Sequence, residues 1–323
     1  DGVRAAILDS VVPAEALDTG GWEATAYGFS SALNALDNDC AASPTCARDI
    51  GSFRERFIAT FEAYDENPIV MDTMDHGSVL NGTVVIDGDL VGGAVFQALY
   101  SNRLYGDFPS LLTALENRDL EAIEAYFGVL GRPSDHSAGN GLELVANCRG
   151  AIKVSEEQFA AMRRAEPKLS QWTDTVGWFE VCNAVYNMNP DPTVKRVVTD
   201  VPILVAAGSI DPIPPPNYSQ SIMPGLANGQ YVEFPHTGHG ALFSNSPGCG
   251  QEIWLAFVND PNAPLDTSCL SNVEAPKFLT QVIETKAPYY LARKIQAGTY
   301  PMPLLVVAGS LLLALILFPI GWV

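Results

Sequence analysis

Residues 201–240 read VPILVAAGSIDPIPPPNYSQSIMPGLANGQYVEFPHTGHG, and this stretch decides the fold. The apolar, β-branched run at Val201–Ala207 predicts a buried strand, and Tyr231–Phe234 predicts a second strand. Between them, Pro212 and the prolines at 214–216 delay a short helix to Tyr218–Leu226. Two strands joined through a helix indicate neighbours in the parallel sheet of an α/β fold.

A polar side chain follows each predicted strand. Asp211 lies in the turn after Gly208, and His236 and His239 lie in the turn after Phe234. Because sites in parallel sheets are built at the carboxyl ends of the strands, an acid and a histidine can meet there. Such a pair can serve a nucleophile: the histidine takes its proton, and the carboxylate orients the ring.

The segment 208–215 (GSIDPIPP), followed by Gly238-His239-Gly240, resembles the C-terminal region of the tripeptidyl-aminopeptidase-like α/β-hydrolases. These are secreted serine exopeptidases, with related proline-specific aminopeptidases and esterases. Residues 1–9 (DGVRAAILD) resemble the strand after the nucleophile-bearing helix of that family. Weaker similarity at Leu111–Leu115 and around Cys148 extends the resemblance over roughly residues 1 to 275.

The resemblance implies that Asp211 is the acid of a catalytic triad and His239 its base, in the chain order nucleophile, acid, histidine. His236 competes with His239, but glycines on both sides of His239 suit a tight turn that presents a side chain. Asp191 and Asp200 compete with Asp211, although both precede the end of the strand. His76 and His136 lie in polar loops, where solvation is expected.

The nucleophile is missing from this chain, because no G-x-S-x-G occurs in it. The nearest approach, Gly28-Phe-Ser30, ends at Ala32. The family pattern places the serine about twenty residues before Asp1. We therefore expect this sequence to be the C-terminal part of an α/β-hydrolase, whose N-terminal half comes from the same precursor or from a separate chain.

Composition limits the partners. With 18 Lys and Arg against 37 Asp and Glu, the formal net charge is 18 − 37 = −19, which excludes nucleic acid and anionic lipid head groups as partners. The acidic surface suits a solvated ectodomain, or alternatively cationic substrates such as free amino termini. No cysteine pair has C-x-x-C spacing and no histidine lies near at zinc-ligand spacing, so neither a metal nor a cofactor is predicted.

The six cysteines predict disulfides and hence an oxidising compartment, although scattered thiols of a cytosolic protein are the alternative. Their order suggests three local pairs among fifteen possible pairings. The three pairs are Cys40–Cys46, Cys148–Cys182 and Cys249–Cys269. The family resemblance supports the second and the third.

The region between the first strand and Val201 is predominantly helical in pattern. Apolar residues at helical spacing predict helices over Trp22–Leu36 and Phe53–Tyr64, the second capped by Ser52, with a polar loop at Asp37–Arg48 between them. In α/β-hydrolases such an insertion is a cap that shapes the pocket. An exopeptidase needs carboxylates there for the free α-amino group. The candidates in this region are Glu143, Asp174 and Glu180, and the alternative for each is a solvated surface charge.

The last segment, Pro303–Val323, reads PLLVVAGSLLLALILFPIGWV. It is free of charge and about twenty residues long, which predicts a transmembrane helix, with a buried globular helix as the alternative. Tyr300 and Trp322 stand at its ends, as interfacial aromatic residues do.

The predicted organisation is an α/β-hydrolase C-terminal part with a large helical cap insertion and one C-terminal transmembrane helix. Its segments are a core strand (1–13), a helical cap (14–195), the C-terminal hydrolase core with the acid and the histidine (196–274), a connector (275–302) and the transmembrane helix (303–323).

Two functions follow from this organisation. The first is a membrane-anchored, extracytoplasmic serine hydrolase of the cell membrane, an aminopeptidase acting on peptide or ester substrates. The second is a non-catalytic, hydrolase-like accessory subunit of a larger membrane complex, which the missing nucleophile favours.

Overall fold

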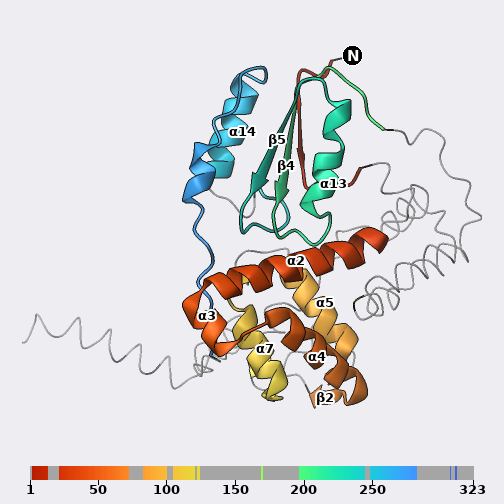
Figure 1. The fold of residues 1–323 in the computed structure, drawn as a ribbon, viewed down its shortest axis with the longest axis vertical. Helices are drawn as coiled ribbons and strands as arrows, with labels where there is room; N and C mark the ends of the chain where they lie inside the picture. Colours follow the sequence, from red (N-terminus) through yellow and green to blue (C-terminus); the bar gives the residue numbers. More distant parts are fainter. Residues whose placement is uncertain are drawn as a thin grey trace, which may run out of the picture.

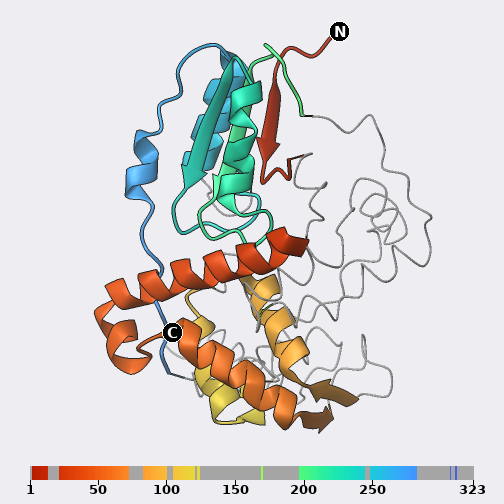
Figure 2. The ribbon, with the colours of Figure 1, turned by 45° about the vertical axis from the view of Figure 1, so that its right-hand side comes forward.

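The fold is taken from a computed structural model of the chain. The structure describes residues 2–13, 22–72, 83–99, 105–120, 122–123, 169, 196–243, 248–281, 306 and 310. Within these ranges a parallel sheet is covered by a helix on each face, and a group of helices lies beyond the arrowheads of the strands (Figures 1 and 2). The predicted α/β fold is thus confirmed.

The sheet has the strand order β1-β4-β5, formed by Ala6–Asp9, Ile203–Gly208 and Gly229–Phe234. Both pairings are parallel, with Ala6 opposite Ile203 and Gly208 opposite Phe234. The central strand β4 is buried along its whole length, as its apolar sequence predicts. In the described part of the chain β1 pairs with β4 alone, and its residues are half-buried.

Alternation along β4 sends its side chains to opposite faces of the sheet. Leu204 and Ala206 pack with β5 against Ile253 and Phe257 of α14 (Cys249–Asn259). Ile203 and Val205 pack on the other face, beside α13 (Pro216–Ser221) and a 3-10 turn at Met223–Gly225. The predicted helix over Tyr218–Leu226 is therefore two short pieces, because Pro224 lacks the N–H that a continuous helix would need.

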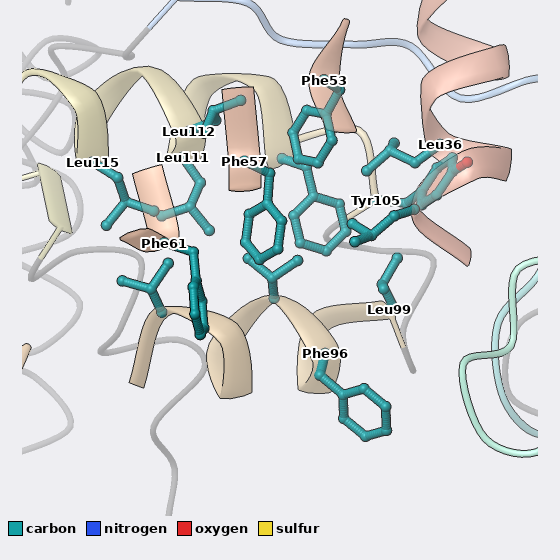
Figure 3. Packing of buried hydrophobic residues seen from close by; sticks show 14 of the residues in the cluster. Leu36, Phe53, Phe57, Phe61, Phe96, Leu99, Tyr105, Leu111, Leu112 and Leu115 are labelled. Carbon is teal, nitrogen blue, oxygen red and sulfur yellow. The ribbon is translucent and has the colours of Figure 1, made fainter. Parts of the chain in front are cut away.

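The second group contains α2 (Trp22–Ala42), α3 (Pro44–Asp49), α4 (Phe53–Glu66), α5 (Gly88–Leu99) and α7 (Phe108–Glu116). Their aromatic and leucine side chains meet in one core, shown in Figure 3. Phe29 packs edge-to-face on Phe57 and Phe96, with ring centroids 5.8 and 5.5 Å apart. Each fully buried side chain of this size contributes about 1.5–3 kcal/mol through its removal from water.

One local prediction in the helical group, the polar loop over residues 37–48, is wrong. Residues 37–48 are helical except for the break between α2 and α3, because Cys40 continues the buried stripe of Leu33 and Leu36. The polar residue Asp37 does not end the helix, since its carboxylate accepts the backbone N–H of Arg54 at 3.2 Å.

A short antiparallel pair of strands, β2 (Ile69–Asp72) and β3 (Thr83–Ile86), lies beside the helices. The predicted cap of α4 is confirmed: the Ser52 side chain accepts the N–H of Glu55 at 3.3 Å.

The start of the predicted connector lies along the helical group. The N–H of Leu279 donates to the carbonyl of Gly106 at 2.8 Å, and Phe278 packs on the ring of Tyr105. Of the predicted transmembrane segment 303–323, only Val306 and Ser310 fall within the described residues. Among the residues that the structure describes, no helix combines the length and the apolar character needed to cross a membrane.

Candidate active site

Asp211 and His239 meet at the carboxyl edge of the sheet. The Nδ1 atom of His239 lies 2.9 Å from Oδ2 of Asp211. Because a carboxylate can only accept, the proton of this bond lies on Nδ1 of the histidine. The Asp211 side chain is fully buried, whereas the His239 side chain keeps 40% of its surface exposed. The pair thus presents an oriented imidazole to solvent and hides the acid behind it.

Hydrogen bonds to the backbone hold both turns. Oδ1 of Asp211 accepts the N–H of Ile213 at 3.0 Å, which fixes the carboxylate within its own turn. The N–H of Ile210 donates to the carbonyl of Thr237 at 3.0 Å and so ties the acid turn to the histidine turn. A side chain at Gly208 would overlap the carbonyl oxygens of Thr237 and Gly238, so the close approach of the two turns requires glycine there.

The environment favours the charged form of the histidine. The hydrogen bond to Asp211 is the largest cause of a raised His239 pKa, and the charges of Asp211 and Asp9 act in the same direction. Burial of the ring opposes them without cancelling the rise in the pKa. An imidazolium formed during proton transfer would therefore be stabilised.

Two residues at the end of β1 hold the segment after His239. The two carboxylate oxygens of Asp9 accept the N–H groups of Ala241 and Leu242 at 3.0 and 2.9 Å. The hydroxyl of Ser10 accepts the N–H of Gly240 at 3.0 Å. Neither residue was among the predicted site residues. The rule that selected Asp211, a polar side chain directly after a parallel strand, also selects Asp9 and Ser10.

His236 pairs with a carboxylate other than Asp211. Its Nδ1 lies 2.8 Å from Oδ2 of Asp39 on α2, and the same oxygen accepts the hydroxyl of Tyr105 at 2.7 Å. Burial raises the pKa of Tyr105, which keeps that hydroxyl protonated as a donor. His236 therefore joins the sheet to the helical group, and Asp211 pairs with His239, the histidine that the sequence prediction preferred.

An open hollow of about 290 Å³ lies beside the His236–Asp39 pair. It is bordered by α2 and by the ends of β4 and β5, with lining residues that include Asn38, Asp39, Ser209, Glu233 and His236. The other described carboxylate candidate, Asp200, is exposed and precedes β4, so it lies at the amino end of the strands, away from the site.

Several predicted residues lie outside the described part of the chain. These are Asp191, the amino-group candidates Glu143, Asp174 and Glu180, the loop histidines His76 and His136, and the pair Cys148 and Cys182. The other two predicted disulfides are confirmed, between Cys40 and Cys46 and between Cys249 and Cys269. The second of these ties the start of α14 to the loop that follows it.

Comparison with known families gives a match over the part of the chain that carries this pair. A family model described as TAP-like protein matches residues 170–269, which include β4, β5, Asp211 and His239. The match supports the resemblance to the tripeptidyl-aminopeptidase-like family and a hydrolase of the α/β-hydrolase superfamily. A search of curated proteins returned no match to this chain.

Proposed function

We propose that this chain supplies the acid and the base of a serine hydrolase, with Asp211 and His239 as two members of a Ser-His-Asp triad. The observation that carries the proposal is the 2.9 Å contact between His239 Nδ1 and the buried Asp211 carboxylate, at the carboxyl edge of a parallel sheet. The TAP-like match over residues 170–269 supports the same assignment.

The proposed chemistry is acyl transfer. A serine hydroxyl attacks the carbonyl carbon of the substrate and gives its proton to Nε2 of His239. His239 then gives that proton to the leaving amine or alcohol, and a water molecule later releases the acyl group by the same route. Asp211 keeps the proton of the resting imidazole on Nδ1, so that Nε2 faces the reaction as the base.

The serine belongs to a segment outside this chain in this proposal, since the chain contains no G-x-S-x-G. That segment is an N-terminal hydrolase half from the same precursor or from a separate chain. The outer edge of β1 could accept it as a further parallel strand, because β1 pairs with β4 alone among the described residues.

The substrate is proposed to be a peptide with a free amino terminus, or an ester. The TAP-like resemblance supports the first. The protein is proposed to be extracytoplasmic and held in the cell membrane by a single helix at 303–323. The two disulfides support an oxidising compartment, and the charge-free sequence of that segment supports the anchor.

A second candidate is a hydrolase-like accessory subunit of a larger membrane complex. The absence of a nucleophile motif from this sequence favours it. Under this proposal Asp211 and His239 would be inherited residues without a reaction to serve.

Labelling with a fluorophosphonate probe separates the two candidates. The native preparation is divided into membrane and soluble fractions, its chains are separated with and without reductant, and labelled peptides are sequenced. We expect label in the membrane fraction, on a serine in a G-x-S-x-G peptide of a longer form of this chain or of a co-purifying chain. Absence of labelling, with a positive control present, would leave the accessory subunit.

His239→Ala should lower the labelling rate by about 10³-fold or more, because the serine then lacks its base. His236→Ala is the matched control: a histidine three residues away, paired with a different carboxylate, whose loss should leave the rate within about threefold. Equal losses in the two variants would argue against His239 as the base.

A further inference from the structure

We propose that Asp9 is a positioning residue for His239: it holds the segment after the histidine so that the ring stays against Asp211. The inference rests on the proposed function, because it assigns Asp9 a task in the same site. It starts from the contacts at the end of β1.

The His239 segment is held from two sides. On the β4 side, Ile210 donates to the Thr237 carbonyl, two residues before His239. On the β1 side, the N–H groups of the three residues after His239 all donate to Asp9 or Ser10. The histidine thus lies between two sets of backbone hydrogen bonds, and its ring contact with Asp211 depends on both.

The local backbone of β1 shows that this arrangement is specific. Ser10 has a φ of 57°, in the left-handed region that serine adopts at some cost. Its N–H still donates to Ala206 on β4, and its buried hydroxyl accepts from Gly240. The left-handed turn therefore lets one residue bind both the sheet and the histidine segment, directly beside Asp9.

A carboxylate suits the position of Asp9 better than a neutral side chain would. Two adjacent N–H groups need two acceptor oxygens, and the Asp9 carboxylate offers one to each. Burial raises the pKa of Asp9, and the bonds from Leu242 and Ala241 lower it in part. Its charge also acts on His239, together with that of Asp211. Asp9 thus acts on His239 in two ways: through hydrogen bonds to the backbone after it, and through the electrostatic effect of its charge.

The test is a titration of His239 by NMR in the full 323-residue chain, which needs no nucleophile. In Asp9→Asn one of the two N–H groups loses its acceptor and the charge disappears. We expect the His239 midpoint to move to lower pH, and the Nδ1 proton signal of the bond to Asp211 to weaken. An unchanged midpoint together with an unchanged Nδ1 signal would overturn the positioning role.

Asp266→Asn is the matched control, since Asp266 also accepts a backbone N–H, that of Ser268 at 2.9 Å, but lies in an exposed loop after α14. It should leave the His239 titration unchanged. If Asp9→Asn does not fold, Ser10→Ala is read instead. That variant keeps all charges but removes the hydroxyl that accepts the N–H of Gly240. It should therefore weaken the Nδ1 signal, and an unchanged signal would again overturn the proposal.

The two proposals can fail separately. In the nucleophile-bearing form, Asp9→Asn should lower the labelling rate and move its acidic limb to lower pH, whereas Asp266→Asn should do neither. Absence of labelling in the unsubstituted protein would sink the serine hydrolase and leave the NMR result to decide the role of Asp9. If the unsubstituted protein is labelled but the His239 midpoint and Nδ1 signal are unchanged in Asp9→Asn, only the positioning role is contradicted.

Discussion

The charge state of His239 is set by the carboxylates around it. The bond to Asp211, aided by the charges of Asp211 and Asp9, raises the His239 pKa above its usual value of about 6.5. A general base must be neutral, so the labelling rate should rise with pH through this raised pKa. Asp211→Asn should move that midpoint to lower pH, which rate measurements from pH 5 to pH 9 would reveal.

The raised pKa of His239 also predicts that the stability of the fold changes with pH. The stabilisation by His239 falls as the pH rises, whereas the labelling rate increases. Because the folded pKa is raised, protonated His239 stabilises the fold fully below the unfolded value of about 6.5, and this contribution is lost as pH rises through the folded pKa. Urea unfolding of His239→Gln should therefore show a larger deficit at pH 5.5 than at pH 8.5. A deficit that grew with pH would contradict the raised pKa.

At the level of residues, the sequence predicted the contact between Asp211 and His239, whereas for Asp9 it indicated a position at the end of a strand but no partner. The first two follow strands with a clear apolar signal and lie in a motif that resembles a known family. Asp9 closes a four-residue strand, and its partners, Ala241 and Leu242, are 232 and 233 positions away. A backbone N–H carries no sequence signal, so no pattern could pair it with Asp9.

Helix α2 is fitted against the turn that carries the acid. Gly28 lies within α2, and a Cβ atom there would overlap the carbonyl oxygen of Pro212, the residue after Asp211. In a helix interior, replacement of glycine by alanine normally stabilises by about 1 kcal/mol. Here the overlap is with backbone, so we expect Gly28→Ala to destabilise by about 1–3 kcal/mol in urea unfolding and to lower the labelling rate.

Asn34→Ala is the control for that prediction, because Asn34 is an exposed position of the same helix. It should change the free energy of unfolding by no more than about 0.5 kcal/mol. A stabilised Gly28→Ala protein would mean that α2 does not press on the Asp211 turn.

The helices also show where pattern reasoning fails. Phe53–Glu66 was predicted well because its aromatic stripe and its Ser52 cap are both local signals. Residues 37–48, which begin with Asp37, Asn38 and Asp39, were assigned to a polar loop. In the fold these side chains find partners on other elements: Asp37 binds the start of α4, and Asp39 binds Tyr105 and His236. Such tertiary contacts override the weak helix propensity of the residues.

On the scale of the whole molecule, the carboxyl edge of the sheet lies against helices that come earlier in the chain. Ile210, beside the acid, belongs to the apolar core of the helical group. Both views place α2 across the ends of β4 and β5 (Figures 1 and 2). The sequence predicted a helical cap over the site, but the element that covers the edge and the contacts that fix it depend on packing between distant segments.

The link from His236 to Asp39 should therefore couple the sheet and the helical group in stability. Asp39 accepts from Tyr105 within the helical group and contacts His236 from the sheet, through the same oxygen. We expect a double-mutant cycle of Asp39→Asn and His236→Gln to give a coupling free energy of about 0.5–1.5 kcal/mol in urea unfolding. Tyr105→Phe, which removes only the second donor, should cost about 1 kcal/mol and leave His236 in place.

Hydrogen exchange would show where the coupling acts. Asp39→Asn should lower the protection of backbone amides in both α2 and β5, since the bond that joins them is weakened. Tyr231→Phe is the matched control: its hydroxyl contacts Glu233 at 2.8 Å within β5 and the carbonyl of Pro216 on α13 at 3.3 Å, so its loss should lower protection in β5 and α13 and leave α2 unchanged. A coupling energy near zero, with exchange altered only in α2, would mean that the helical group and the sheet are held together by apolar packing, and that the His236–Asp39 pair adds nothing to it.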